Sequence, residues 1–191
     1  MIDYSIIFDY LQKNLSSKRY NHSINVSNEA IKLAKYHDCD TNKAKLAGLV
    51  HDCAKDISIQ EQEYYAKNCG FFVDSITYKI PELIHAPASV YVCKKVFKIT
   101  DIEVLSSIRY HTTGKADMSL IEKIIFISDI IEPSREFKDV EMLRKLAYEN
   151  LDEALLYALD SSIIYIVGKK SILHFDTIYA RNYVLNSIIF G

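Results

Sequence analysis

The sequence contains few of the residues that interrupt or end helices. Among its 191 residues there are five glycines and three prolines. No segment alternates apolar and polar residues for long, as a half-buried strand would, whereas apolar residues recur at helical spacing along most of the chain. These patterns predict an all-α fold. Because the chain has no low-complexity linker, we expect a single domain over residues 1–191.

Cysteine motifs, membrane-length apolar runs and strong net charge are also missing. The four cysteines show neither CxxC spacing nor a zinc-finger pattern, and we expect free thiols in a reducing compartment at Cys39, Cys53, Cys69 and Cys93. The N-terminus MIDYSIIFDY carries acids where a signal peptide carries bases, so a cytoplasmic location is expected. A net charge of −2 argues against a nucleic-acid polymer or an anionic membrane as partner, while a small polyanion still fits.

Capping patterns divide the chain into helices. Three residue pairs have the spacing of a capping box, in which each side chain bonds the other residue's backbone: Ser58 with Glu61, Thr100 with Glu103, and Ser119 with Glu122. Pro81 opens another helical region, and Pro87 is expected to interrupt it early. The C-terminal part is predicted to form helices at roughly residues 140–149, 151–167 and 176–189.

The most informative feature is the adjacent pair His51-Asp52. It lies in the apolar stretch Ala44–Lys55, whose pattern predicts a buried helix carrying the pair. Burying a carboxylate among aliphatic side chains is unfavourable unless a cation or several donors compensate it. A metal ion compensates both residues at once, so we interpret the pair as part of a metal site.

Four further residues are candidates to complete that site: His22, His85, His111 and Asp129. Each lies in or beside a predicted helix, and Asp129 is again a lone acid among apolar residues. Imidazole and carboxylate ligands suit Fe, Mn, Co or Zn. Six protein ligands exceed what a tetrahedral zinc site needs, and they suit two metals that share one carboxylate, as in two-metal hydrolases.

Basic and small residues close to these ligands are candidates for substrate binding and catalysis. Arg19, Lys55 and Arg135 each lie within six residues of a predicted ligand, and we expect them to contact phosphate groups or to orient site carboxylates. The turn Thr112-Thr113-Gly114 follows His111, and its backbone amides could hold an oxyanion, although a plain helix end explains it almost as well. Glu132 is a candidate to hold Arg135 or a water molecule.

Taken in order, these residues resemble the HD-domain metal-dependent phosphohydrolase superfamily. The resemblance covers about residues 18–137, and the helices at about 140–189 are expected to complete the domain. Five segments resemble its YqeK-type branch in particular: Arg19–His22, His51–Lys55, Ile84–Pro87, Tyr110–Gly114 and Ser128–Arg135. That resemblance implies a helical bundle around a di-iron centre and symmetrical cleavage of diadenosine tetraphosphate into two ADP. Older labels tie this branch to NAD metabolism.

The expected roles follow from one metal pair sharing one carboxylate. The predicted assignment puts His22, His51 and Asp129 on one metal, His85 and His111 on the other, and Asp52 between the two. Two cations would lower the pKa of a bridging water, and the resulting hydroxide would attack phosphorus.

Several other functions are compatible with the same predicted ligands. Other HD-type nucleotide phosphatases and hydrolases of guanosine tetraphosphate or pyrophosphate would share the metal core, and a non-catalytic nucleotide sensor would use the same pocket. Ligand types do not separate iron from manganese or cobalt. Fourteen tyrosines give no means of locating the nucleobase pocket. A homodimer through the C-terminal helices is a further prediction.

Overall fold

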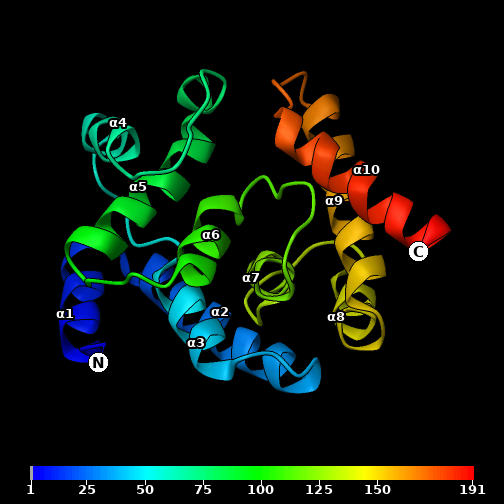
Figure 1. Ribbon diagram of the computed structural model, residues 1–191, viewed down its shortest axis with the longest axis horizontal. Helices are drawn as coiled ribbons and strands as arrows, with labels where there is room; N and C mark the ends of the chain where they lie inside the picture. Colours follow the sequence, from blue (N-terminus) through cyan, green and yellow to red (C-terminus); the bar gives the residue numbers. More distant parts are fainter. Residues whose placement is uncertain (1) are drawn as a thin grey trace.

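The computed structural model describes residues 2–191, and over this range the chain forms ten α-helices, one short 3-10 helix and no strand (Figure 1). The all-α prediction is therefore confirmed. In chain order the elements are α1 (Tyr4–Asn14), α2 (Ser17–Tyr36), α3 (Thr41–Val50), α4 (Ile59–Lys67), η1 (Thr77–Lys79), α5 (Pro81–Lys95), α6 (Ile102–Tyr110), α7 (Leu120–Ile131), α8 (Val140–Glu149), α9 (Leu151–Gly168) and α10 (Phe175–Phe190). Among the described helices, none has the length and apolar character needed to cross a membrane. All four cysteines are free thiols.

Four helices form the centre of the molecule. α2 packs against α3 and α7, and α6 packs against the same two helices. α4 and α5 pack together on one side of this group, while α8, α9 and α10 lie on the other (Figure 1). Aliphatic side chains fill the centre, among them Leu33, Leu49, Ile108 and Ile125, each at most 1% exposed.

Helices α2 and α3 approach closely at Gly48. A Cβ atom at this position would lie 2.9 Å from the Cα atom of Ser27, which is closer than packed atoms tolerate. Glycine therefore permits the spacing of the two helices. Because His22 lies in α2 and the His51-Asp52 pair follows α3, this close approach brings two parts of the predicted site together.

Two of the three predicted capping boxes are present, at Ser58 for α4 and at Ser119 for α7. The prediction for Thr100 is wrong. Helix α6 begins after Asp101, whose carboxylate accepts two backbone N–H groups of the first turn. An aspartate caps at least as well as a threonine and adds a negative charge that the helix N-terminus favours.

Pro87 does not interrupt α5, which corrects the prediction made from the sequence. The helix runs unbroken from Pro81 to Lys95 with Pro87 inside it. A proline here removes one backbone hydrogen bond, the one that would reach the carbonyl of Leu83. Pro87 is itself buried among other buried residues of α5, and we attribute the intact helix to this packing.

Candidate metal centre

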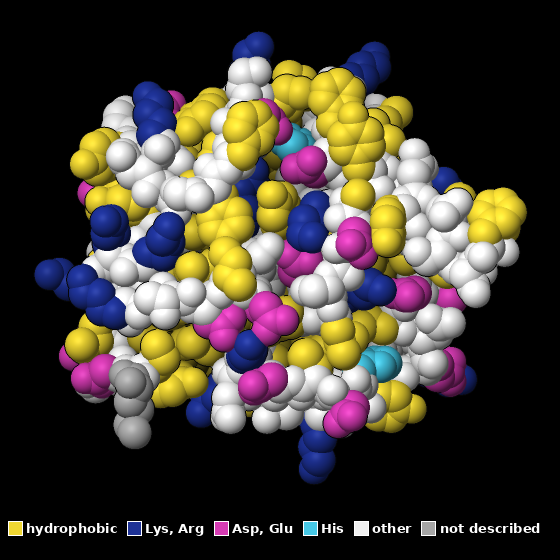
Figure 2. All heavy atoms as spheres, viewed as in Figure 1, with side chains coloured by type: hydrophobic (Ala, Val, Ile, Leu, Met, Phe, Trp, Pro, Cys, Tyr) yellow, Lys and Arg dark blue, Asp and Glu magenta, His cyan; other side chains and the backbone are white. Residues whose placement is uncertain are grey.

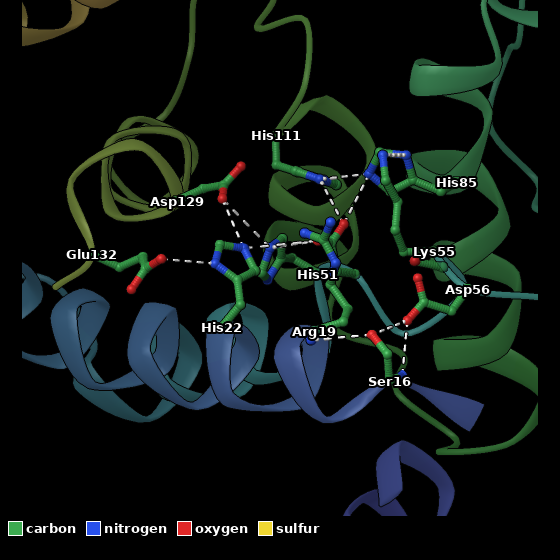
Figure 3. Close-up of polar contacts among 12 residues, drawn as sticks. Ser16, Arg19, His22, His51, Lys55, Asp56, His85, His111, Asp129 and Glu132 are labelled. Carbon is green, nitrogen blue, oxygen red and sulfur yellow. Dashed lines mark hydrogen bonds and ion pairs between the residues drawn. The ribbon is translucent and has the colours of Figure 1, made fainter. Parts of the chain in front are cut away.

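The six predicted ligands converge at one place in the centre of the bundle (Figure 3). They come from five segments of the chain: His22 from α2, His51 and Asp52 from the turn after α3, His85 from α5, His111 from the end of α6, and Asp129 from α7. The apolar pattern predicted that this helix carries the His-Asp pair, and that prediction is wrong: α3 ends at Val50, and the pair lies in the turn that follows.

Asp52 lies between two pairs of imidazoles. Its Oδ2 atom is 3.5 Å from Nε2 of His51 and 3.8 Å from Nε2 of His22. Its Oδ1 atom is 2.9 Å from Nε2 of His85 and 3.5 Å from Nε2 of His111. One carboxylate oxygen thus faces each pair, which is the arrangement that a carboxylate shared by two cations needs.

Hydrogen bonds fix the orientation of three of the rings. Nδ1 of His51 donates to a backbone carbonyl one turn earlier (2.8 Å), and Nδ1 of His111 does the same (2.7 Å). Nδ1 of His22 donates to a carboxylate oxygen of Glu132 (3.1 Å). Because each acceptor requires the ring proton on Nδ1, the lone pair of each Nε2 atom points to the centre of the site.

The atoms that meet at the centre are hydrogen-bond acceptors. Nε2 of His22 and Oδ1 of Asp129 are 2.9 Å apart. Nε2 of His22, Nε2 of His51 and Oδ1 of Asp52 are buried without a hydrogen-bond partner. Converging lone pairs are unfavourable in a buried site unless a cation lies among them. The donor set therefore fits divalent metal ions.

Two groups of ligand atoms are compact enough to hold an ion. The ligand atoms of His22, His51 and Asp129 lie within 4.8 Å of one another, and so do those of His51, Asp52 and His111. The first group is the predicted set for one metal. The second contains His111 and the shared Asp52, and His85 adjoins it because its Nε2 atom is 3.1 Å from Nε2 of His111.

The ionisation states also suit a metal site. Burial penalises the charged imidazolium and lowers the pKa of His85 to about 4, so this ring is neutral at pH 7 and keeps its lone pair. Burial alone would raise the pKa of Asp52, but the neighbouring His51 side chain lowers it well below its usual value, and Asp52 in turn raises the pKa of His51 against the effect of burial. Asp52 is therefore ionised, and a bound metal would displace any proton from Nε2 of His51. Neutral imidazoles and ionised carboxylates are the forms that bind metals.

Glu132 supports His22, a role that was not predicted from the sequence. Its side chain is fully buried, and its second oxygen accepts a hydrogen bond from the side-chain amide of Asn25 (3.0 Å). Figure 3 shows Glu132 and Asp129 beside different nitrogens of the His22 ring. The predicted contact of Glu132 with Arg135 is long, at 3.7 Å. The sequence feature that could have indicated this role is an acid three residues after Asp129, at the end of an apolar helix.

Replacing Glu132 by glutamine is expected to weaken metal binding and turnover about 10- to 100-fold, because the amide no longer holds the His22 ring with a full negative charge. Metal titration of the apoprotein measures the effect. Glu136→Gln is the matched control, since Glu136 is an exposed acid four residues away. Equal metal affinity in the Glu132 variant and the wild type would contradict this role.

Arg19 and Arg135 contact the two carboxylates of the site. Nη1 of Arg19 is 2.5 Å from Oδ2 of Asp52, and Nη2 of Arg135 is 2.6 Å from Oδ1 of Asp129. Their side chains are 29% and 41% exposed. Each guanidinium group thus joins the buried centre to solvent, where a phosphate group can reach it.

Lys55 contacts one of the predicted ligands, and Thr112 lies beside a pocket. Nζ of Lys55 is 2.9 Å from Nδ1 of His85, and burial lowers the pKa of this lysine. Thr112 is half-buried, and it lines a pocket that adjoins the ligands.

The remaining two residues of the predicted oxyanion turn have structural contacts. The hydroxyl of Thr113 donates to the carbonyl of Gly114, and the N–H of Gly114 donates to the carbonyl of Tyr110. Gly114 has a φ of +66°, and a Cβ atom on it would lie 2.9 Å from the Cβ atom of Ala180 in α10. These contacts leave Thr112 as the residue of the turn that faces the pocket.

A pocket of about 850 Å³ opens beside the centre. One wall is the start of α5 with Ile80, Glu82 and Leu83, and the other is α9 with the loop that follows it, including Tyr157, Tyr165 and Ile172. Thr112 and Ile130 also line it, and they directly follow the predicted ligands His111 and Asp129 in the sequence. The walls are mainly apolar, and the volume falls in the range of small-molecule sites.

This chain is similar to known proteins of one family. The HD-domain family matches residues 19–134. Three relatives carry the name bis(5'-nucleosyl)-tetraphosphatase, symmetrical. The protein from Halalkalibacterium halodurans is 38% identical, over 92% of this chain and 93% of the relative. The proteins from Bacillus subtilis and Staphylococcus aureus are 32% and 35% identical, over 92% and 90% of this chain and 94% and 89% of their own lengths.

A solved structure is similar over almost its whole length. It is described as a predicted HD superfamily hydrolase involved in NAD metabolism, from Clostridium acetobutylicum. It is 45% identical, with a TM-score of 0.94, and the match covers 98% of this chain and 99% of that one. The chain therefore belongs to the HD-domain family, within the YqeK-type branch of hydrolases that its motifs resemble.

Proposed function

We propose that this protein is a metal-dependent phosphohydrolase that cleaves dinucleoside polyphosphates, and that it converts diadenosine tetraphosphate symmetrically into two ADP. The observation that carries the hydrolase assignment is Asp52, which turns one carboxylate oxygen to each of two imidazole pairs. The names of the three relatives supply the substrate class.

Two divalent ions would be held by His22, His51 and Asp129 on one side and by His85 and His111 on the other, with Asp52 shared. When bound, such ions activate water near neutral pH and neutralise charge on phosphoryl oxygens. We propose iron as the native metal, with manganese or cobalt as substitutes, because imidazole and carboxylate ligands suit all three.

The chain's own residues position the substrate and exclude water. Arg19 and Arg135 lie at the exposed side of the centre, where their guanidinium groups can bind phosphate oxygens in place of part of their present ion pairs. The apolar pocket beside Thr112 would take one nucleoside.

In the reaction one water adds to a central phosphorus, and the bond from that phosphorus to the central bridging oxygen breaks. The bridging oxygen leaves on the second ADP.

Product analysis tests this function directly. We expect iron-loaded protein, kept anaerobic, to convert diadenosine tetraphosphate into ADP alone, two molecules for each substrate. In water labelled with oxygen-18, one of these two ADP molecules should carry a single label. ATP with AMP, free phosphate or pyrophosphate as products would contradict symmetrical cleavage, and they would favour another HD-type phosphatase. Binding without turnover would favour a nucleotide sensor.

The assembly and the cellular location stay predictions. Large apolar side chains are exposed on α9 and α10, among them Ile164, Tyr165, Tyr179 and Phe190, and they are consistent with the predicted homodimer through the C-terminal helices. We propose a cytoplasmic location on the basis of the sequence composition.

A further inference from the structure

A second polar cluster lies outside the metal centre and joins distant parts of the chain. Nε2 of His174, at the start of α10, is 2.8 Å from Oδ2 of Asp74 and 3.1 Å from Oγ1 of Thr77. The segment before α5 and the N-terminus of α10 thus meet through side chains 97 and 100 residues apart in sequence. We call these three residues, Asp74, Thr77 and His174, the clasp. His174 is 3% exposed and Thr77 is 1% exposed.

Asp74 and His174 of the clasp have, together with Asp176, the spacing of a metal site but not its hydrogen bonding. Nδ1 of His174 accepts the backbone N–H of Asp176 (3.1 Å) as the N-cap of α10, so its ring proton lies on Nε2 and is donated to Asp74. The other oxygen of Asp74 accepts the backbone N–H groups of Ile76 and Thr77, both at 2.8 Å. Both ring nitrogens are therefore used within the protein. In contrast to the metal centre, the clasp has no converging lone pairs that call for a cation.

The clasp connects the two walls of the 850 Å³ pocket. Asp74 and Thr77 belong to the segment that leads into the wall formed by Ile80 and Leu83, while His174 lines the opposite wall itself. Figure 1 shows η1 and the loop between α9 and α10 at the same end of the molecule. In Figure 2 apolar side chains gather over that loop. Away from the clasp, α9 and α10 pack on each other, α9 packs on α7 and α8, and Tyr183 of α10 donates a hydrogen bond to Asp117.

We propose, on the basis of the function proposed above, that Asp74 and His174 are positioning residues that fix the distance between the walls of the nucleoside pocket. A wall held in place before binding does not need to be ordered by the ligand, so the clasp raises affinity for the nucleoside half of the substrate. It does not touch the metal ligands. Its loss should therefore weaken nucleotide binding and leave binding of the bare phosphate chain unchanged.

Two variants break the clasp in different ways. His174→Asn keeps a residue that caps helices well, so α10 still starts normally, but its side chain is shorter than imidazole. Asp74→Asn removes the charge that accepts the His174 proton. Asp160→Asn is the matched control, because Asp160 pairs with Arg181 between α9 and α10 (2.8 Å) and does not line the pocket. It loosens the same helices without touching the clasp.

The experiment measures the affinity of metal-loaded protein for ADP and for inorganic pyrophosphate by calorimetry. We expect each clasp variant to bind ADP about tenfold more weakly, the value for losing one charge-assisted hydrogen bond, and to bind pyrophosphate like the wild type. The double variant should lose little more than either single variant, because the two residues act as one unit. With diadenosine tetraphosphate, KM should rise by a similar factor while kcat changes little.

The outcomes separate this inference from the proposed function. Unchanged ADP affinity in both clasp variants, or an equal loss for pyrophosphate, would overturn the positioning role. An equal loss of ADP affinity in Asp160→Asn would overturn it as well, since it would mark general loosening of the helices. A wild type that binds ADP but leaves diadenosine tetraphosphate intact would instead contradict the proposed substrate.

Discussion

Replacing Asp52 by alanine is expected to abolish hydrolysis and to remove most of the bound metal. Asp52 is the one described residue whose carboxylate faces both imidazole pairs, with Oδ1 toward His85 and His111 and Oδ2 toward His22 and His51. Alanine leaves neutral imidazoles and Asp129 to hold two divalent ions, with one negative charge fewer. We expect turnover to fall by at least about 1,000-fold, in line with the loss of a group that electrostatic catalysis requires.

Metal analysis of the purified variant, together with an assay for ADP release, measures both effects. Asp56→Ala is the control, because Asp56 is an exposed aspartate four residues away that bonds Ser16 and none of the six predicted ligands. A variant that retains two metals per chain would refute the shared position of Asp52. One that loses metal but keeps full turnover would refute the metal-dependent mechanism.

Replacing Gly48 by valine is expected to destabilise the fold by about 3 kcal/mol and to disrupt the site, because overpacking at a helix crossing forces the backbones apart. The first atom of the new side chain would lie 2.9 Å from Cα and 3.0 Å from N of Ser27, and neither backbone atom can move without moving α2. Because α2 carries His22 and α3 leads into His51, a shift here separates two ligands of one predicted metal.

Chemical denaturation compares this variant with the wild type. Gly168→Val adds the same side chain at a position where a Cβ atom meets nothing within 4 Å, and it should change stability little. If the two valine variants were equally stable, the close approach of α2 and α3 would not be what requires glycine at position 48. If Gly48→Val were destabilised yet bound metal as tightly as the wild type, the spacing of these helices would matter for folding alone.

The starting point for predicting the site was a pair of acids that are anomalous in their local sequence. Asp52 and Asp129 are acids in apolar stretches, and such acids need compensation wherever the chain folds. The pocket was not predictable, since its walls come from residues 80 to 177, and no local pattern reports which apolar side chains will face each other across a gap. His174 had no assigned role for the same reason: its partner Asp74 is 100 residues away.

Local rules failed where neighbouring residues competed or tertiary packing intervened. Thr100 and Asp101 both suit the first position of a helix, and sequence alone does not rank them reliably. The proline at position 87 predicts a helix break. The helix nevertheless continues, because a helix with buried residues around the proline tolerates the loss of one hydrogen bond. Glu132 was recognised as relevant but given a different partner, because the fold places the nitrogen of a histidine 110 residues away beside it.

The origin of the six predicted ligands in five separate segments has a consequence for synthesis of the protein. His22 emerges from the ribosome early and Asp129 more than a hundred residues later. A nascent chain therefore cannot assemble the predicted centre until α7 has emerged and docked onto α2, since contacts so distant in sequence form late. We therefore expect hydrolysis only from polypeptides that already include α7.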